Sequence, residues 1–315
     1  CKNHNVPTAK YSFFDNEKKA LDFLDTVDFP TVIKADGLAA GKGVIIAKNK
    51  NEAVETIKNI MSKRIFGTSG ENIIIEEFLE GEEISFFALV DTNGFILPLT
   101  TAQDHKKIGE GDTGLNTGGM GAYSPVPFIK QNQINDFVIK FVKPVIKDLK
   151  HNNIFFSGIF YAGLILTKYG PKLLEINVRF GDPEAQAVLP RLKADLLDLL
   201  LASSKGRLDQ LKSPEWDNNF CINVVMASKG YPESYKKNTI IGGLNKTTVN
   251  KSQYIFHSST RKNEDHWLAT GGRVLSISAL GSTLKEARNK AYNVINEIDW
   301  KSGYYRNDIG WKHLT

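Results

Sequence analysis

Cysteine is nearly absent from the 315-residue sequence, which contains only Cys1 and Cys221. Two cysteines without a spacing pattern form neither a disulfide framework nor a cysteine metal site, so we expect a reducing, cytoplasmic setting. No apolar run approaches the length of a membrane span, and no amino-terminal signal pattern is visible. The sequence therefore predicts no association with a membrane.

A long basic run is also missing. The net charge of +5 is spread along the chain, so we expect small anionic ligands rather than nucleic acid as partners. With 41% hydrophobic and 24% charged residues the composition is that of a globular protein. The length leaves room for two domains or one large one, with a sizeable core.

The most informative stretch is LLEINVRFGDPE, from Leu173 to Glu184. If residues 172–180 form a strand, Glu175, Asn177 and Arg179 share one face. The opposite, core-facing side chains are then Leu174, Ile176, Val178 and Phe180. A carboxylate and an amide oxygen suit Mg²⁺, and a guanidinium suits a phosphate or a carboxylate. An edge strand with a solvated polar face explains the same pattern.

A glycine-rich segment, DGLAAGKGV, covers Asp36 to Val44 after a predicted strand at residues 31–35. It is one residue short of a Walker phosphate loop, lacks the loop's Ser/Thr, and precedes a strand at residues 44–47 instead of a helix. The pattern predicts a flap, within a small subdomain of about residues 30–80, whose N–H groups and lysines fold over phosphates. A plain hairpin turn is the alternative.

Two further segments have ligand-binding character. The apolar run Ile73–Ile75 leads into the acids of residues 76–83, which suits nucleotide recognition as well as it suits a solvated turn. Residues 109–125 are rich in glycine and show no periodicity, yet contain the apolar anchors Leu115, Met120 and Tyr123. A long loop of this kind is usually functional or disordered, and the anchors favour an ordered ligand loop.

The remaining periodicity predicts the framework. Helices are expected at residues 17–24, after a cap at Asn51, and at residues 134–149 with a kink at Pro144. Strands are expected at residues 84–90, 95–101 and 157–166, and a helix begins at Asp195.

The pattern resets between about residues 205 and 218, so we expect one domain over residues 1–210 and a smaller α+β domain over 211–315. The second domain has predicted strands at residues 221–227, 254–257 and 273–280. Thr283 and Glu286 form a capping box that begins its helix.

Six motifs together resemble the ATP-grasp superfamily and, within it, the glycinamide ribonucleotide synthetases: VIKADGLAAGKGV, IIIEEFLEGEE, QDHKK, DTGLNTGGMGAYSP, LLEINVRFGDPE and TGGRVL, with DIGW near the end. The resemblance covers nearly the whole chain. It implies an α+β ATP-grasp fold, two α+β subdomains that clasp ATP, followed by a smaller C-terminal α/β domain.

The resemblance also implies a carbon–nitrogen ligase of de novo purine biosynthesis. ATP phosphorylates the carboxylate of glycine, and the amine of 5-phosphoribosylamine attacks the glycyl phosphate, giving glycinamide ribonucleotide, ADP and phosphate. The implied ATP contacts are Lys34, Gly41, Lys42, Gly43, Glu76, Glu77, Phe78, Leu79 and Glu83. The implied metal ligands, for Mg²⁺ or Mn²⁺, are Glu175 and Asn177. The implied substrate contacts are Asp112, Asn116, Thr117, Gly119, Arg179, Asp182 and Arg273, with Arg179 and Asp182 catalytic.

The sequence departs from this family pattern at three places. Leu115 stands where the family usually has proline, and residues 257–260 read His-Ser-Ser-Thr instead of His-Ala-Gly-Thr. Nothing here matches the domain, on the order of 100 residues, that precedes this point in the family. We expect a monomer. The alternatives are an ATP-grasp ligase with another acceptor, or an ATP-binding fragment without complete catalysis.

Overall fold

The computed structural model describes residues 1–39, 43–264 and 266–314. The chain divides into two compact units. Unit 1 is Cys1–Glu82 with Ile165–Leu174, and unit 2 is Glu83–Leu164 with Glu175–Thr315. The boundary that the sequence suggests near residue 210 falls inside unit 2 and stays a prediction. None of the described helices is long and apolar enough to cross a membrane.

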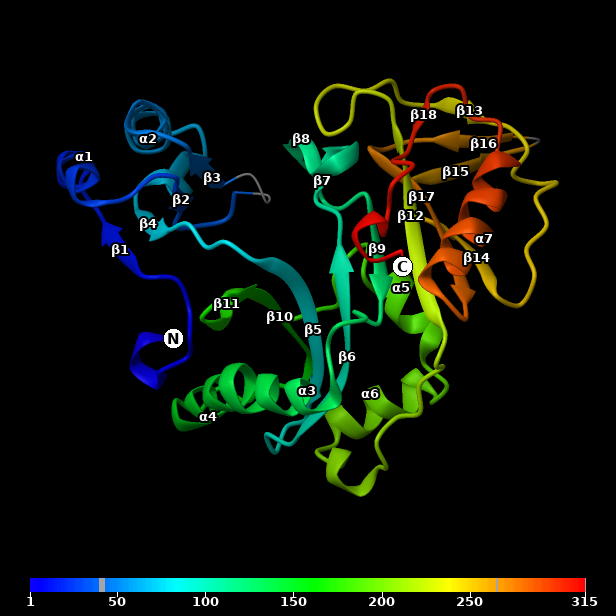
Figure 1. The fold of residues 1–315 in the computed structure, drawn as a ribbon, viewed down its shortest axis with the longest axis horizontal. Coiled ribbons are helices and arrows are strands. Elements are labelled where there is room, and N and C mark those ends of the chain that lie inside the picture. Colours follow the sequence, from blue (N-terminus) through cyan, green and yellow to red (C-terminus); the bar gives the residue numbers. More distant parts are fainter. Residues whose placement is uncertain (40–42, 265, 315) are drawn as a thin grey trace. The chain divides into compact units, whose positions relative to one another are not determined.

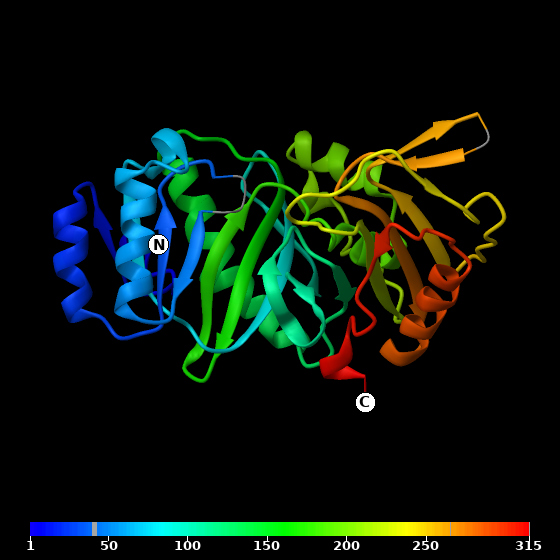
Figure 2. The ribbon, with the colours of Figure 1, turned by 90° about the horizontal axis from the view of Figure 1, so that it is seen from above.

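Unit 1 contains an antiparallel sheet with the strand order β1-β4-β2-β3 and two helices, α1 and α2, which lie side by side (Figure 2). The elements are β1 Tyr11–Phe14, α1 Glu17–Phe23, β2 Thr31–Ala35, β3 Val44–Ala47, α2 Lys50–Ile57 and β4 Ile73–Glu77. Strand alternation directs Ile33 and Ile75 into a core shared with Ala20 and Ile57 of the helices. The core therefore lies on one face of this sheet.

Asparagine side chains begin both helices of unit 1. Asn16 accepts a hydrogen bond from Lys19 N, and Asn49 accepts one from Glu52 N. The predicted cap at Asn51 was wrong. Asn49 has the extended backbone that a cap requires, and the helix has already begun at Lys50.

Unit 2 is organised on a long sheet with the order β11-β10-β5-β6-β9-β12-β17-β14, and β18 pairs with β12 (Figure 1). Its strands are β5 Glu82–Val90, β6 Ile96–Asp104, β9 Gly121–Ser124, β10 Gly158–Thr167, β11 Gly170–Asn177, β12 Phe220–Ser228, β14 Gln253–His257, β17 Arg273–Gly281 and β18 Gly303–Tyr304. Smaller sheets pair β7 Lys107–Gly109 with β8 Thr113–Asn116, and join β13 Thr239–Ile241, β15 Thr260–Asn263 and β16 His266–Ala269.

The helices of unit 2 are α3 Gln131–Phe137, α4 Lys143–His151, α5 Ala185–Val188, α6 Leu196–Ser204 and α7 Leu284–Asn296. α7 packs on β17 and β12, and Thr283 begins it by accepting from Glu286 N, as predicted. The second half of the predicted capping box was wrong, because the Glu286 carboxylate accepts from Ser282 N and Ser282 Oγ instead of from Thr283 N. A π-helical turn, Val138–Val142, separates α3 from α4 just before Pro144. Proline has no N–H to continue the helical ladder, and the regular α-helix is interrupted at this point; the predicted kink itself stays a prediction.

The glycine-rich segment, predicted as an ordered ligand loop, contains the β7–β8 hairpin and then β9 of the long sheet. The predicted end of the strand over residues 172–180 was wrong. Strand β11 ends at Asn177, so Arg179 lies beyond it, and the buried residue is Leu173. Val178 is 69% exposed and Ile176 37% exposed, because β11 is an edge strand of the sheet.

Candidate functional site

Lys34 and Glu76, two of the predicted nucleotide contacts, lie on one face of the unit 1 sheet. The register pairs Val32 with Glu76, so Lys34 and Glu76 share the face opposite the helices. There Lys34 Nζ lies 2.7 Å from Glu76 Oε2. Four apolar side chains of the same face, Tyr11, Phe13, Val44 and Ile46, are each about half exposed. This face is an apolar platform with an ion pair in it.

Glu77 is the last residue of β4, and two other residues of unit 1 donate hydrogen bonds to its carboxylate. Its Oε1 accepts from Lys10 N at 2.9 Å and from Lys172 Nζ at 2.6 Å. Burial opposes the charged form, but Lys172 and Lys10 lower the pKa of Glu77. Phe78 and Leu79 follow the strand end, where main-chain groups are no longer part of the sheet. Gly43 is described, whereas Gly41 and Lys42 lie outside the described residues.

A polar row crosses one face of the unit 2 sheet. It consists of Glu83 and Ser85 on β5, Asp104 on β6, Tyr161 on β10 and Glu175 on β11, with Lys106 and Glu184 beside it. Ser85 Oγ lies 3.1 Å from Tyr161 Oη and donates to Glu184 Oε1 at 2.9 Å. Lys106 Nζ pairs with the Glu83 carboxylate. Four neighbouring strands thus each contribute a polar side chain.

The charges of this row interact strongly. Burial raises the pKa of Asp104 to about 7, with Lys106 opposing the shift and Glu184 and Glu83 adding to it. Burial disfavours the ammonium of Lys106, but Asp104 and Glu83 outweigh it and raise the pKa of Lys106 above its usual range. The row therefore gathers an excess of carboxylates around one firmly protonated lysine, as expected where cations and phosphates are to be bound.

Glu175, a predicted metal ligand, is exposed, and its side chain packs against Gly163. A Cβ at Gly163 would lie 2.9 Å from Glu175 Cγ, so only glycine leaves the carboxylate its place. In the described part of the chain, no cationic side chain pairs with Glu175. Asn177, two residues later on the same strand, is half-buried. A free carboxylate and an amide oxygen fit a hard divalent cation.

The described residues contain no group of three or more His, Cys, Asp or Glu side chains able to hold a metal by themselves.

Asp182 and Arg273, predicted substrate contacts, are joined to each other. Arg273 Nη2 lies 2.9 Å from Asp182 Oδ2, while Nη1 donates to Asp182 O and to Gly118 O. Next to them, a Cβ at Gly119 would lie 2.3 Å from Pro183 Cδ. These contacts hold residues 117–119 against the turn that follows β11.

The other predicted substrate residues differ in their surroundings. Asn116 is exposed on β8, and Arg179 Nη1 donates to Phe180 O. Thr117 Oγ1 donates to Lys106 O and accepts from Gly119 N, so this hydroxyl fixes the local turn. The carboxylate of Asp112 is engaged by Arg306 at 3.0 Å and by Lys312 at 2.6 Å.

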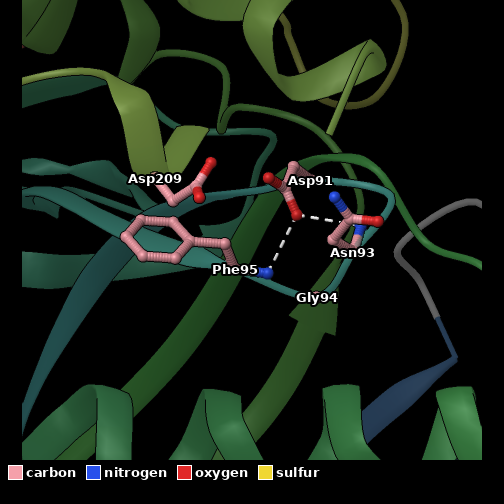
Figure 3. Close-up of a pocket in the computed structure, with 5 residues that line it drawn as sticks. All are labelled: Asp91, Asn93, Gly94, Phe95 and Asp209. Atoms are coloured by element: carbon pink, nitrogen blue, oxygen red, sulfur yellow. Dashed lines mark hydrogen bonds between the residues drawn. The ribbon is translucent and has the colours of Figure 1, made fainter. Parts of the chain in front are cut away.

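A hollow of about 330 Å³ lies beside the β5–β6 turn, lined by Asp91, Asn93, Gly94, Phe95 and Asp209 (Figure 3). Asp91 Oδ1 accepts from Asn93 N and Phe95 N, and Oδ2 accepts from Leu208 N. Three N–H donors already satisfy this buried carboxylate. We therefore infer that Asp91 has a structural role and connects the β5–β6 turn to Leu208. None of the predicted site residues that the structure describes lines the hollow.

Sequence reasoning missed Asp104, Tyr161, Gly163 and Glu184 as neighbours of the site. Asp104 and Glu184 stand in motifs quoted above, so their acidity was visible although their position was not. Tyr161 and Gly163 lie within an apolar strand, where alternation places both on one face but gives no sign that this face is functional.

Comparison with known proteins identifies the family. Residues 1–185 match the phosphoribosylglycinamide synthetase ATP-grasp (A) domain, and residues 221–312 match the C domain of the same synthetase. The chain is 47% identical over its whole length to the chloroplastic phosphoribosylamine–glycine ligase of Arabidopsis thaliana, of which it spans 59%. It is 42% identical to the Rhizobium meliloti phosphoribosylamine–glycine ligase and spans 73% of that protein.

A solved structure agrees with these matches. The crystal structure of phosphoribosylamine–glycine ligase from Thermotoga maritima superimposes with a TM-score of 0.85 at 31% identity, over 98% of this chain and 75% of that one. The predicted ATP-grasp fold followed by a C-terminal domain is confirmed. The chain belongs to the phosphoribosylglycinamide synthetase family of ATP-grasp ligases.

Proposed function

We propose that this chain carries out the reaction for which its relatives are named, the ATP-dependent joining of glycine to 5-phosphoribosylamine. The products are glycinamide ribonucleotide, ADP and phosphate. The observation that carries the proposal is the carboxylate of Glu175, which has no cationic partner among the described residues and lies in the polar row with Glu83 and Asp104. The whole of this chain matches the ligases.

The ATP contacts are proposed for each unit by itself. In unit 1, the apolar platform around Lys34 and Glu76 offers contact area for a base and a cation for phosphate. The main chain at Phe78 and Leu79 leaves the sheet and can pair with a base edge. In unit 2, Glu83 is the acid suited to ribose hydroxyls. The Lys42 segment is assigned to the phosphates on sequence alone.

The metal is Mg²⁺ or Mn²⁺, held by Glu175 and Asn177. When bound, such an ion neutralises phosphate charge, which is most of what phosphoryl transfer requires of its surroundings. A glycine carboxylate oxygen attacks the γ-phosphorus of ATP and ADP leaves. The amine nitrogen then attacks the carbonyl carbon of glycyl phosphate, and phosphate leaves with its bridging oxygen.

Arg179 and Asp182 are the residues we assign to the glycine and amine. A guanidinium pairs well with a carboxylate or an acyl phosphate, and an aspartate pairs with an amine. Asp182 is oriented for this role by Arg273 and by Gln186, whose Nε2 donates to Asp182 Oδ1 at 3.0 Å. A monomeric state and a cytoplasmic setting stay predictions.

The test is an assay of ADP release with glycine and 5-phosphoribosylamine, followed by identification of the product by mass. We expect equal amounts of ADP and glycinamide ribonucleotide, and little ADP when alanine replaces glycine. Turnover with another amino acid or amine would favour an ATP-grasp ligase of different specificity. Tight binding of ATP without any turnover would favour a nucleotide-binding fragment.

A further inference from the structure

Arg306 is a completely buried arginine close to the end of the chain. Its Nε and Nη2 donate to the two oxygens of Asp308 at 2.7 and 2.8 Å. Its Nη1 donates to Asp112 Oδ1 and to Lys107 O, both at 3.0 Å. A buried charge is costly unless it is paired and hydrogen-bonded, and this one is paired with two carboxylates and a main-chain carbonyl.

The residues on either side of Arg306 contact the same hairpin. Tyr304 Oη donates to Ile108 O at 2.9 Å, and Asn307 donates to Glu110 Oε1 from both N and Nδ2. Gly111 N donates to Asp308 Oδ2 at 2.7 Å. Together with the bonds of Arg306, these contacts reach five of the six residues from Lys107 to Asp112.

The backbone of the hairpin turn needs such support. Gly111 has φ of 63° and Asp112 has φ of 57°, a region that residues other than glycine seldom adopt. Lys312 Nζ holds the second oxygen of Asp112, and Gly310 N donates to the ring of His105, which precedes the hairpin. The turn is thus fixed by residues of the chain's last segment.

The far end of the same loop is also fixed by the C-terminal part of the chain. Gly118 O accepts from Arg273, and Gly118 N donates to Tyr231 Oη at 3.0 Å. Between these two anchored ends, residues 113–116 are all exposed. The arrangement is a loop that is held at both ends and leaves its middle residues open to a ligand.

We propose that residues 304–312 act in the ligase reaction by positioning the loop of residues 107–118, and that Arg306 is the principal positioning residue. The proposal rests on the proposed function, because it takes that loop as the contact for glycine and 5-phosphoribosylamine. It gives the C-terminal domain a part in the chemistry without contact with the reacting atoms. Asp112 then anchors the loop instead of binding substrate.

The test compares hydrogen exchange of the amides of residues 107–118 and steady-state kinetics in three variants, Arg306→Gln, Tyr304→Phe and Asn307→Ala. The last two each remove only side-chain contacts to the loop, so they keep the test available if Arg306→Gln does not fold. Arg191→Lys is the matched control, because Arg191 is a buried arginine whose bonds go to residues 100, 124, 217 and 219.

We expect faster exchange confined to residues 107–118, and a kcat/KM for glycine or 5-phosphoribosylamine reduced between about 10- and 100-fold with an unchanged KM for ATP. Faster exchange over the whole chain, or the same kinetic loss in Arg191→Lys, would overturn the proposal. If the unaltered chain shows no glycine-dependent turnover, the proposed function fails. The hydrogen-exchange comparison then tests only whether residues 304–312 position the loop. Exchange of residues 107–118 that is the same in the variants and in the unaltered chain would refute that positioning role.

Discussion

Glu175 of β11 lies directly over Gly163 of β10, so closely that a Cβ at residue 163 would stand 2.9 Å from Glu175 Cγ. The side chain of Glu175 on the edge strand therefore packs against Gly163, which has no side chain of its own. This relationship leads to two predictions about the metal.

Glu175→Gln should reduce phosphoryl transfer by more than about 100-fold, because removing even an outer-shell partner of a metal costs about 10- to 100-fold. The midpoint of thermal unfolding should hardly change, since the side chain is exposed. Glu233→Gln, at another exposed acid of unit 2, is the control. The measurements are the Mg²⁺ dependence of ADP release and a thermal melt. An unchanged Mg²⁺ dependence in Glu175→Gln would refute the ligand assignment.

Gly163→Ala should weaken the metal site without changing any charge, because the new methyl group displaces the Glu175 carboxylate. We expect a higher Mg²⁺ concentration for half-maximal activity, measured by titration at saturating ATP. Adding Gly163→Ala to Glu175→Gln should have almost no further effect, because the ligand on which Gly163→Ala acts is already lost. Fully additive losses would show that Gly163 acts elsewhere.

The buried hydrogen bonds of Arg191 lead to a prediction about stability that does not involve the candidate site. Its guanidinium donates to Asn219 O, Asp217 O, Thr100 Oγ1 and Ser124 Oγ, and no carboxylate of the described residues pairs with it. Arg191→Ala leaves these acceptors unsatisfied, which should lower the free energy of unfolding by about 2–3 kcal/mol. Urea denaturation measures it. A loss no larger than that of a surface arginine such as Arg64→Ala would contradict this reading.

The lowered pKa of Asp112 makes the stability of the folded chain depend on pH. His105, Lys312 and Arg306 lower the pKa of Asp112 below its usual range in the folded chain. The contribution to stability is therefore complete above the ordinary aspartate pKa of about 3.9 and is lost progressively as the pH falls below it. Asp112→Asn should be less stable than the unaltered chain at pH 7, and the difference should shrink towards pH 3. A difference that stays constant from pH 7 to pH 3 in urea titrations would contradict this.

The sequence predicts a structural feature well when the residues that determine the feature lie close together in the chain. Thr283 and Glu286 are three residues apart and start α7 as expected, because a helix cap is decided within one turn. The strand that carries Glu175 was found, but its end was not. Its edge position, which leaves Val178 exposed, depends on strands far away in the chain.

The hairpin at residues 107–116 shows the limit more sharply. Glycines at 109, 111 and 114 suggest a loop, and the β7–β8 pairing of Lys107 with Asn116 was not visible in the apolar pattern. Its support comes from Arg306, which is 194 positions from Asp112. No periodicity or motif connects two residues at that separation, so the clamp could be found only in the folded chain.

The most direct test of the account is to follow oxygen from glycine. If glycine is activated as glycyl phosphate, one carboxylate oxygen must leave with the phosphate when the amine attacks. With glycine labelled with ¹⁸O in its carboxylate, ATP, 5-phosphoribosylamine and Mg²⁺, mass spectrometry should find one ¹⁸O atom in each phosphate released. Phosphate that carries no label, released together with ADP, would show that ATP is not spent on the glycine carboxylate and would contradict the central claim.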